Sequence, residues 1–258
     1  MTENRTDPLR IMAFFAHPDD ETMFMGGTLA YLAERGVEIH YLCATRGEGG
    51  EMGDPPICAR GDLGKVREKE LVCAVKALNG KSLQFLAYED PVVGLDGELY
   101  PFSDDFDKLV GEVREKILEI IPQIILTHGP GGEYGHPAHI QTHQALIAAL
   151  EDLNLRNLTV YAPSWLSRET GEFTPEPGIL VDVSSWIKQK IEAAMCHRSQ
   201  HGLFIRHGSA RAGRPVTVPE VVRGIEALYR ISQTVEKPQD DPLSALLKEI
   251  SLPGLGDN

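Results

Sequence analysis

The sequence predicts an α/β fold in which a mostly parallel sheet is flanked by helices within a single domain. Short apolar runs rich in β-branched and aromatic residues alternate with longer stretches of helical periodicity, which is the pattern of β-α-β units. A chain of 258 residues also has the length of one large domain and can bury a sizeable core.

Six short apolar runs are predicted strands, because each is bounded by polar or turn-forming residues. They cover residues 10–16, 37–44, 82–87, 123–128, 157–162 and 178–183. Helices are predicted at 21–35, 63–78, 104–121, 138–153, 184–197 and 218–233. Gly36 suits the end of the first helix, Asp62 the start of the second, and Pro122 the end of the third.

Three longer connections interrupt this alternation: the glycine-rich residues 45–61, residues 88–103, and the basic residues 199–216. Ligands of open α/β sheets bind outside the carboxyl ends of the strands, so chemistry is expected on such loops. Residues 1–235 are expected to form the domain, and residues 236–258 a linker and tail. The tail is expected to pack on its own subunit or on a neighbouring one.

Charge and cysteine content narrow the possible partners and location. With 25 Lys and Arg against 38 Asp and Glu, the formal net charge of −13 would repel nucleic acid and anionic membranes. The polar start, residues 1–10, and the short apolar run after it make neither a signal peptide nor a membrane span. Four cysteines without a C-x-x-C pair are interpreted as reduced thiols, so a cytoplasmic protein is expected.

The segment that leaves the first predicted strand carries an imidazole and three acids: His17, Asp19, Asp20 and Glu21. His17 and Asp20 are three residues apart across a turn and could bind one metal ion, while Asp19 could act as a base. The same acids could instead cap the helix that follows and favour its dipole.

A second segment also leaves a predicted strand and enters a helix. It holds four of the nine histidines of the chain: His128, His136, His139 and His143. Pro137 suits the first position of a helix, which makes His136 the cap and turns His139 toward the loop. Two histidines and a carboxylate leave an open position on a tetrahedral zinc ion, as a catalytic site requires. The predicted ligands are His17, Asp20 and His139.

At these residues the chain resembles a known family, the LmbE-like (PIG-L) zinc-dependent N-acetylglucosaminyl de-N-acetylases, which include deacetylases of mycothiol and bacillithiol synthesis. The resemblance rests on AHPDDE at 16–21, TRGEGGE at 45–51 and GEYGHPAH at 132–139, with shorter patterns at 67–71 and 194–200. It covers most of residues 10–200 in the expected order.

The resemblance implies a Rossmann-like sheet and an oligomeric assembly. The zinc ligands that it implies are His17, Asp20 and His139, the three that spacing also predicts. It assigns Asp19 as the general base. Glu48 and Arg67 resemble positions that hold the sugar in related enzymes, although each could be only a solvated charge. Because histidine and carboxylate ligands admit several divalent ions, Fe²⁺ or Co²⁺ could replace zinc.

The family pattern further implies that His136, with Tyr134 nearby, stabilises the oxyanion or protonates the leaving amine. Family members often have an acid at the position that Ala138 occupies here. If that acid orients or charges the histidine before it, His136 is expected to titrate lower in this chain, or Glu133 to take over the role.

One feature of the sequence is not part of the family resemblance. Residues 193–219 contain no Asp or Glu but include Arg206, Arg211 and Arg214. This basic segment is expected to form a positive wall of the pocket that selects an anionic substrate, with Arg206 as a substrate contact. It could also lie at a subunit contact or be an exposed loop.

The predicted function is removal of the acetyl group from an N-acetylglucosamine-type amino sugar or conjugate, by metal-activated water with an aspartate base. The expected partners are a small-molecule amino sugar and further copies of the chain. An amidase of a larger thiol-cofactor or sugar conjugate is the alternative within the family. A non-catalytic carbohydrate- or nucleotide-binding module is the alternative from another class, although acids at the first helix start would repel phosphate.

Overall fold

The computed structural model describes residues 8–94, 97–155, 158–167, 171–231 and 242–253. The strands of its main sheet are β1 (Arg10–Phe15), β2 (Glu38–Thr45), β3 (Ser82–Tyr88), β4 (Ile124–Leu126), β5 (Thr159–Pro163), β8 (Ile179–Asp182) and β9 (Ile225–Arg230). A separate two-stranded ribbon pairs β6 (Trp165–Leu166) with β7 (Phe173–Thr174).

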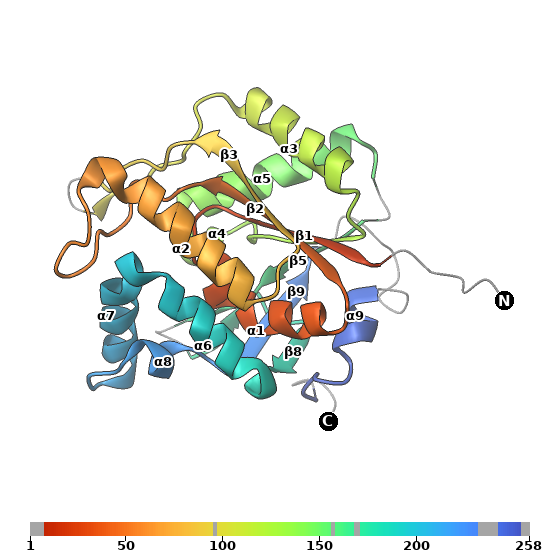
Figure 1. The fold of residues 1–258 in the computed structure, drawn as a ribbon. Helices are drawn as coiled ribbons and strands as arrows, with labels where there is room; N and C mark the ends of the chain where they lie inside the picture. The colour runs from red at the N-terminus through yellow and green to blue at the C-terminus, as the bar shows by residue number, and fades with distance from the viewer. Residues whose placement is uncertain (1–7, 95–96, 156–157, 168–170, 232–241, 254–258) are drawn as a thin grey trace.

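The helices lie on both faces of the sheet. They are α1 (Asp20–Glu34), α2 (Leu63–Ala77), α3 (Phe106–Ile120), α4 (Gly132–Gly135), α5 (Pro137–Asp152), α6 (Ile187–Cys196), α7 (His201–Ala212), α8 (Val218–Val221) and α9 (Pro242–Leu247). The strand order is β3-β2-β1-β4-β5-β9-β8 (Figure 1). Strands β3 to β5 are parallel, and β9 is antiparallel to its neighbours β5 and β8. The predicted mostly parallel α/β sheet is therefore confirmed.

The central strand β1 is apolar on both sides, as a strand between two helical layers must be. Ile11, Ala13 and Phe15 belong to the core formed with α1, α2 and α6. Met12 and Phe14 belong to the core formed with α3 and α5. Figure 1 shows these two helical layers on opposite sides of the sheet. The alternation of side chains along β1 thus builds both halves of the core.

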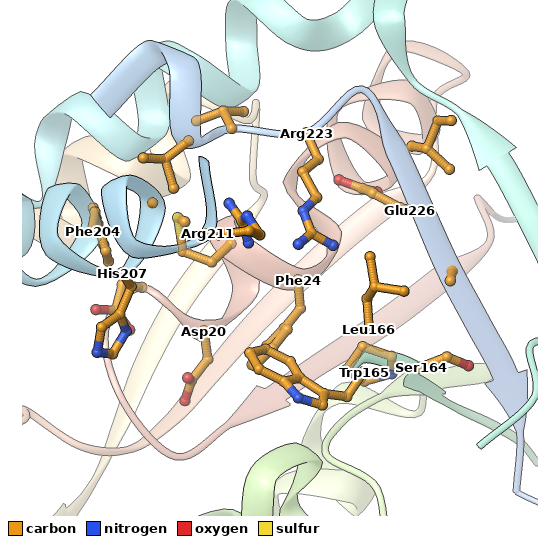
Figure 2. A pocket seen from close by; sticks show the side chains of 18 of the residues that line it. Asp20, Phe24, Ser164, Trp165, Leu166, Phe204, His207, Arg211, Arg223 and Glu226 are labelled. Carbon is orange, nitrogen blue, oxygen red and sulfur yellow. The ribbon is translucent and has the colours of Figure 1, made fainter. Parts of the chain in front are cut away.

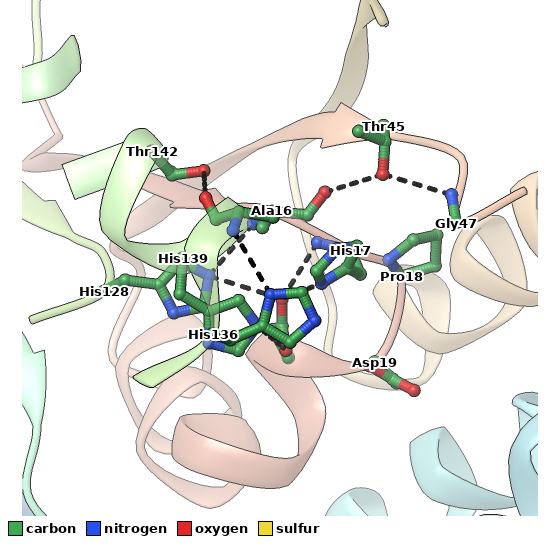
Figure 3. Close-up of polar contacts among 12 residues, drawn as sticks. Ala16, His17, Pro18, Asp19, Thr45, Gly47, His128, His136, His139 and Thr142 are labelled. Atoms are coloured by element: carbon green, nitrogen blue, oxygen red, sulfur yellow. Dashed lines mark hydrogen bonds and ion pairs between the residues drawn. The ribbon is translucent and has the colours of Figure 1, made fainter. Parts of the chain in front are cut away.

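The carboxyl ends of β1 and β4 lie side by side, because the two strands pair in the sheet. The chain leaves β1 through Ala16 and His17 and leaves β4 through Thr127 and His128. The backbone amide of Ala16 donates a hydrogen bond to Nε2 of His128 at 3.0 Å. The carbonyl of Ala16 accepts from both the amide and the hydroxyl of Thr45 at the end of β2 (Figure 3). These bonds join the loops that carry the predicted site.

The predicted helix over residues 218–233 is wrong. Of the described residues 218–231, only the short turn α8 is helical, and residues 225–230 form strand β9 between β5 and β8. Glu226 of this strand accepts hydrogen bonds from the amides of Gly27 and Thr28 in α1 and from the ammonium of Lys190. A short apolar run fits either a helix or a strand by its periodicity, and here the sheet pairing decides.

The basic residues 199–216 were expected to form a connection, and that expectation is also wrong, because most of them form α7. Glycines at 202 and 208 lower the helix propensity of this segment. Gly208 is nevertheless required by packing, since a Cβ atom there would lie 2.4 Å from the side chain of Val221. The helix therefore lies close against α8.

The expectation of four reduced thiols is wrong as well. Cys73 of α2 and Cys196 at the end of α6 form a disulfide, with their Cα atoms 5.7 Å apart. Cys43 and Cys58 are free. The two bonded cysteines are 123 residues apart in sequence, and only the packing of α2 against α6 brings them together. Disulfides persist in oxidising surroundings, so this bond removes the reason for placing the chain in the cytoplasm.

Part of the predicted tail packs on its own subunit. Leu243 and Leu247 of α9 are fully buried in the core below α1. The hydroxyl of Tyr31 donates to the carbonyl of Leu246 at 2.7 Å. The predicted linker over 236–241 lies outside the described residues. None of the helices in the described ranges combines the length and the hydropathy that a membrane crossing requires.

The disulfide leads to a prediction about stability. Replacing both Cys73 and Cys196 with Ser should lower the free energy of unfolding by about 2 to 5 kcal/mol, because the bond closes a long loop in the unfolded chain. Denaturant unfolding of the two forms measures the difference. Cys58→Ser is the matched control, since Cys58 is free. Equal stability of the double variant and the wild type would contradict the bond.

Candidate metal centre

Asp20 is the centre of a buried cluster of imidazoles at the carboxyl edge of the sheet. Its Oδ2 lies 3.4 Å from Nδ1 of His17 and 3.3 Å from Nε2 of His128, and its Oδ1 lies 3.4 Å from Nε2 of His139. The ring of His136 stacks on that of His139 at 4.5 Å. Figure 3 shows the four imidazoles gathered in one place. The structure thus brings the three predicted ligands together and adds His128 and His136 beside them.

Two sets of these residues could hold a cation. In each set the candidate ligand atoms lie within 4.8 Å of one another: His17, His136 and His139 in one, and Asp20, His128 and His139 in the other. His139 belongs to both, and its Nε2 is a buried atom without a hydrogen-bond partner. Because its other nitrogen is bonded to Glu133, this unpaired Nε2 is available as a metal ligand. The residues therefore fit a divalent cation.

Glu133 supports the cluster from behind. Its Oε2 accepts hydrogen bonds of 2.8 Å from Nδ1 of both His128 and His139, and its Oε1 accepts from the amide of Gly129. A histidine that donates from Nδ1 keeps Nε2 free for a metal. Burial favours the neutral form of Glu133, whereas the neighbouring His128 and His139 favour its carboxylate. The effect of the two histidines is larger and holds the pKa of Glu133 well below its ordinary value. The carboxylate therefore fixes the orientation of both imidazoles.

Asp19 stands at the position that would cap α1, but its side chain makes no capping hydrogen bond. Its backbone has a φ of 120°, which an L-residue rarely adopts. The carboxylate instead lies 3.3 Å from the guanidinium of Arg67. Burial raises the pKa of Asp19 to about 7, against the opposing effect of Arg67. Asp19 therefore does not cap α1. It lines a cavity at the carboxyl edge of the sheet instead.

Arg67 and Glu48 both hold loops in place. The buried guanidinium of Arg67 donates to the carbonyls of Gly47 at 2.9 Å and Pro18 at 2.6 Å. Arg67 also lines the same cavity as Asp19. Glu48 accepts a hydrogen bond of 3.0 Å from the amide of Asp90. This bond positions Asp90, whose carboxylate lies 3.2 Å from Nε2 of His17. A sugar contact for Glu48 or Arg67 stays a prediction.

His136 caps α5 with Pro137 in the first position, as expected. Its Nδ1 accepts a hydrogen bond from the amide of Ala138 at 3.2 Å, so its proton resides on Nε2 when the ring is neutral. Burial and the neighbouring His17 and His139 lower the pKa of His136 to about 3. These causes do not involve residue 138, so the expected effect of Ala138 on His136 stays a prediction. Glu133 contacts other imidazoles in the cluster.

The basic segment is divided between surface pairs and a cavity. Arg206 pairs with Glu51, and Arg214 pairs with Glu220 at 2.9 Å. Arg211 lines a cavity that also reaches Asp20. Glu51, the partner of Arg206, lines the larger cavity, whereas Arg206 lines neither cavity. Its role as a substrate contact stays a prediction.

Two cavities meet at the cluster, and Asp19, Asp20, Tyr134 and His207 line both of them. The larger, of about 520 Å³, extends over the loops at 45–61 and 88–103. The smaller, of about 200 Å³, extends toward α7, β6 and β9 (Figure 2). Tyr134 stands between them, with its ring 5.4 Å from that of His139.

A sheet with a histidine and carboxylate cluster at its strand ends defines an α/β protein with a candidate metal site. The chain belongs to the PIG-L family, whose model, described as GlcNAc-PI de-N-acetylase, matches residues 12–150. That match contains both loops of the cluster. The resemblance drawn from the sequence is therefore confirmed.

Individual relatives agree with this assignment. An enzyme named 1D-myo-inositol 2-acetamido-2-deoxy-alpha-D-glucopyranoside deacetylase 3, from Catenulispora acidiphila, is 36% identical over 56% of this chain, which spans only 45% of that enzyme. A probable N-acetyl-alpha-D-glucosaminyl L-malate deacetylase 2 from Bacillus anthracis is 31% identical over 74% of this chain and 80% of its own length. The N,N'-diacetylchitobiose deacetylase structure from Pyrococcus horikoshii has a TM-score of 0.63 at 19% identity, covering 91% of this chain and 89% of its own. This structural similarity shows that the two proteins share a fold.

Sequence reasoning missed Asp90 completely and left the role of His128 open. Asp90 lies in an irregular connection without a motif, and its place beside His17 depends on its bond to Glu48. His128 carried a signal, because it is the last residue of a predicted strand that ends at the same edge as His17. Its Nε2 accepts a hydrogen bond from the amide of Ala16 and lies 3.3 Å from Oδ2 of Asp20.

The geometry of Glu133 leads to a prediction about metal affinity. Glu133→Gln should weaken zinc binding by about 10- to 100-fold, because an amide cannot accept from both Nδ1 atoms as strongly as a carboxylate does. Titration with a competing chelator measures the affinity. Glu151→Gln is the matched control, because Glu151 is an exposed glutamate near the end of α5, the helix that carries His139. Equal affinity of the two variants would contradict the supporting role.

Proposed function

We propose that this chain is a metal-dependent hydrolase that removes the N-acetyl group from an N-acetylglucosamine-type amino sugar or conjugate. The observation that carries the proposal is the buried contact of Asp20 with His17, His128 and His139, with Asp19 one residue away at the junction of two cavities. The names of the two relatives in its family, both deacetylases of N-acetylated glucosaminyl compounds, support the same reaction.

The proposed ligands are His17, Asp20 and His139, and the proposed ion is Zn²⁺, with Fe²⁺ or Co²⁺ as alternatives. When bound, such an ion supplies a Lewis acid that makes water nucleophilic at neutral pH and polarises an amide carbonyl. The unpaired, buried Nε2 of His139 and the carboxylate of Asp20 support this set.

Asp19 acts as the general base in this proposal. Its Oδ2 is held by Arg67 at 3.3 Å, so the carboxylate stays at the cavity junction and is kept out of the helix cap. From there it accepts the proton of the attacking water and delivers it toward the amine that leaves. Arg67 orients the base, because its other hydrogen bonds tie it to the carbonyls of Gly47 and Pro18.

His136 and Tyr134 face the reacting carbonyl from the other loop. With Nδ1 accepting from Ala138, a neutral His136 offers its Nε2–H to the oxygen on which negative charge develops. The phenol of Tyr134, between the two cavities, offers a second donor. The pair therefore stabilises an oxyanion in this proposal.

The larger cavity suits the sugar. Its lining combines Arg67, Asp90 and Gln200 with the apolar side chains of Val92 and Tyr100. Charged and amide groups can pair with sugar hydroxyls, and apolar surface can pack against the ring. Glu48 acts through Asp90 here. Assembly into a homo-oligomer remains a proposal from the sequence. A cytoplasmic location is also a proposal, and the disulfide between Cys73 and Cys196 is an argument against it.

The reaction is tested by amine release from N-acetylglucosamine, diacetylchitobiose and a glucosaminyl conjugate, with the protein loaded with zinc and with the metal removed. Asp19→Asn should lower kcat/KM at least 100-fold, because it removes the base, while bound zinc stays stoichiometric. Asp62→Asn is the matched control, since Asp62 stands at the cap of α2 and is exposed. Activity that survives complete chelation would overturn the mechanism.

A further inference from the structure

The backbone of Asp19 is unusual even among residues with a positive φ. Asp19 has a φ of 120° and a ψ of −24°. The other four non-glycine residues of positive φ in the described part of the chain have values between 51° and 59°, which lie in the ordinary left-handed region. A residue outside that region keeps its conformation only where its surroundings hold it. The contacts of Asp19 must therefore account for its backbone.

This conformation determines what the carboxylate of Asp19 can bind. Asp105 stands at the same position before α3, but with a φ of −108° and a ψ of 87°. Its carboxylate accepts a hydrogen bond of 3.0 Å from the amide of Lys108, the third residue of that helix, as a capping aspartate does. The third residue of α1 is Thr22, yet Asp19 makes no capping bond. The positive φ therefore keeps the carboxylate of Asp19 out of the cap.

Glu21 binds the backbone of Asp19 in this conformation. Its Oε2 accepts a hydrogen bond of 3.2 Å from the amide of Asp19, and the carbonyl of Asp19 accepts from the amide of Met23 at 2.9 Å. Glu21 is only 2% exposed, and a hydrogen bond is electrostatically stronger in such surroundings than in water. Glu21 thus holds the peptide group of the base, while Arg67 holds its carboxylate.

Glu21 is itself held by two side chains. Its Oε1 accepts a hydrogen bond from the hydroxyl of Thr22 and lies 3.4 Å from Nε2 of His197. His197 directly follows α6 and is completely buried. A buried carboxylate needs partners of this kind. Thr22 and His197 occupy one oxygen of Glu21, and the other oxygen binds the amide of Asp19.

The segment that carries His197 is fixed to the helix that carries Arg67. Glu70 lies one turn after Arg67 in α2, and both side chains are buried. The carboxylate of Glu70 accepts hydrogen bonds from the amide and the hydroxyl of Ser199, at 2.8 and 2.7 Å. The two shorter sequence patterns of the family resemblance therefore converge on the surroundings of Asp19.

We propose that Glu21 is a positioning residue for the base. By binding the amide of Asp19, it holds the backbone in the conformation that keeps the carboxylate out of the helix cap and at the junction of the two cavities. Thr22 and His197 fix Glu21 in the orientation that this requires. The inference rests on the proposed function, in which Asp19 takes the proton of the attacking water. Glu21 transfers no proton itself.

An acid in the first turn of a helix can also act only through the helix dipole. Such an effect stabilises the helix but does not depend on a bond to the residue before it. Asp107, an exposed acid in the first turn of α3, provides the comparison. The two roles differ in what they change: the dipole affects the free energy of unfolding, whereas positioning of the base affects kcat.

The first test measures kcat and KM for N-acetylglucosamine and diacetylchitobiose. Glu21→Leu should lower kcat by roughly 10- to 100-fold, because the base is no longer held in place. KM should change by less than about threefold, and bound zinc should stay stoichiometric. Glu21→Gln should stay within about threefold of the wild type, since its amide oxygen can still accept from Asp19. Asp107→Leu is the matched control.

Equal losses in Glu21→Gln and Glu21→Leu would overturn the proposal, because the charge of Glu21 and not its bond to the amide would then be required. Thermal unfolding of each variant establishes that it folds. If Glu21→Leu does not fold, Thr22→Val takes its place, because it removes one donor to Glu21 at nearly the same volume. Its kcat should fall by about threefold or more, and an unchanged kcat would count against the proposal.

A double variant separates positioning from general damage. Asp19→Asn already removes the base, so adding Glu21→Leu to it should lower kcat by less than about threefold further. Losses that multiply would show that Glu21 acts on something other than Asp19, and the proposal would be wrong.

A crystal structure of zinc-loaded Glu21→Leu gives a readout that does not need turnover. Without its partner, Asp19 should adopt a negative φ, and its carboxylate should accept from the amide of Thr22, as Asp105 does at α3. The same structure of Glu21→Gln should retain the positive φ. An unchanged Asp19 in the leucine variant would contradict the positioning role.

The outcomes also separate this inference from the proposed function. Hydrolysis that is lost in Asp19→Asn but retained in Glu21→Leu would keep the function and reject the positioning role. Conversion of Asp19 into a helix cap in Glu21→Leu, in a protein that hydrolyses none of the amides, would keep the positioning role and reject the function. Loss of zinc from Glu21→Leu would assign Glu21 to the support of Asp20 and reject the inference.

Discussion

The buried carboxylate of Asp20 is the contact on which the site depends. Its two oxygens face imidazoles from three places: His17 after β1, His128 after β4 and His139 in α5. Burial favours the neutral form, but His139 and His128 hold its pKa well below the ordinary value. An isolated buried charge would cost several kcal/mol. The loops after two neighbouring strands must therefore converge if this charge is to be compensated.

A second layer of carboxylates surrounds these imidazoles and is itself held by the backbone. Glu133 binds Nδ1 of His128 and His139, and Asp90 binds His17. The amide of Gly129 donates to Glu133. Each imidazole therefore has its orientation fixed by the protein, and a cation entering the cluster would meet ligands that need little rearrangement.

The sequence predicted the cluster well because its members lie in segments that leave two strands adjacent in the sheet. His17 directly follows β1, and His139 lies in the first turn of the helix that follows β4. Parallel strands bring such segments to one edge. The residues that were missed depend on contacts between distant segments. The strand β9 is defined by its pairing with β5 and β8, which are distant in sequence. The disulfide of Cys73 requires α2 and α6 to be packed together.

The strand β9 is also tied directly to the helix that begins at the metal cluster. Glu226 of β9 is bonded to Gly27 and Thr28, two turns along α1 from Asp20 at its start. A Cβ atom at residue 27 would lie 2.4 Å from the side chain of Val183, so the glycine permits this close approach. One rigid helix thus joins the carboxylate that would bind the metal to the strand β9.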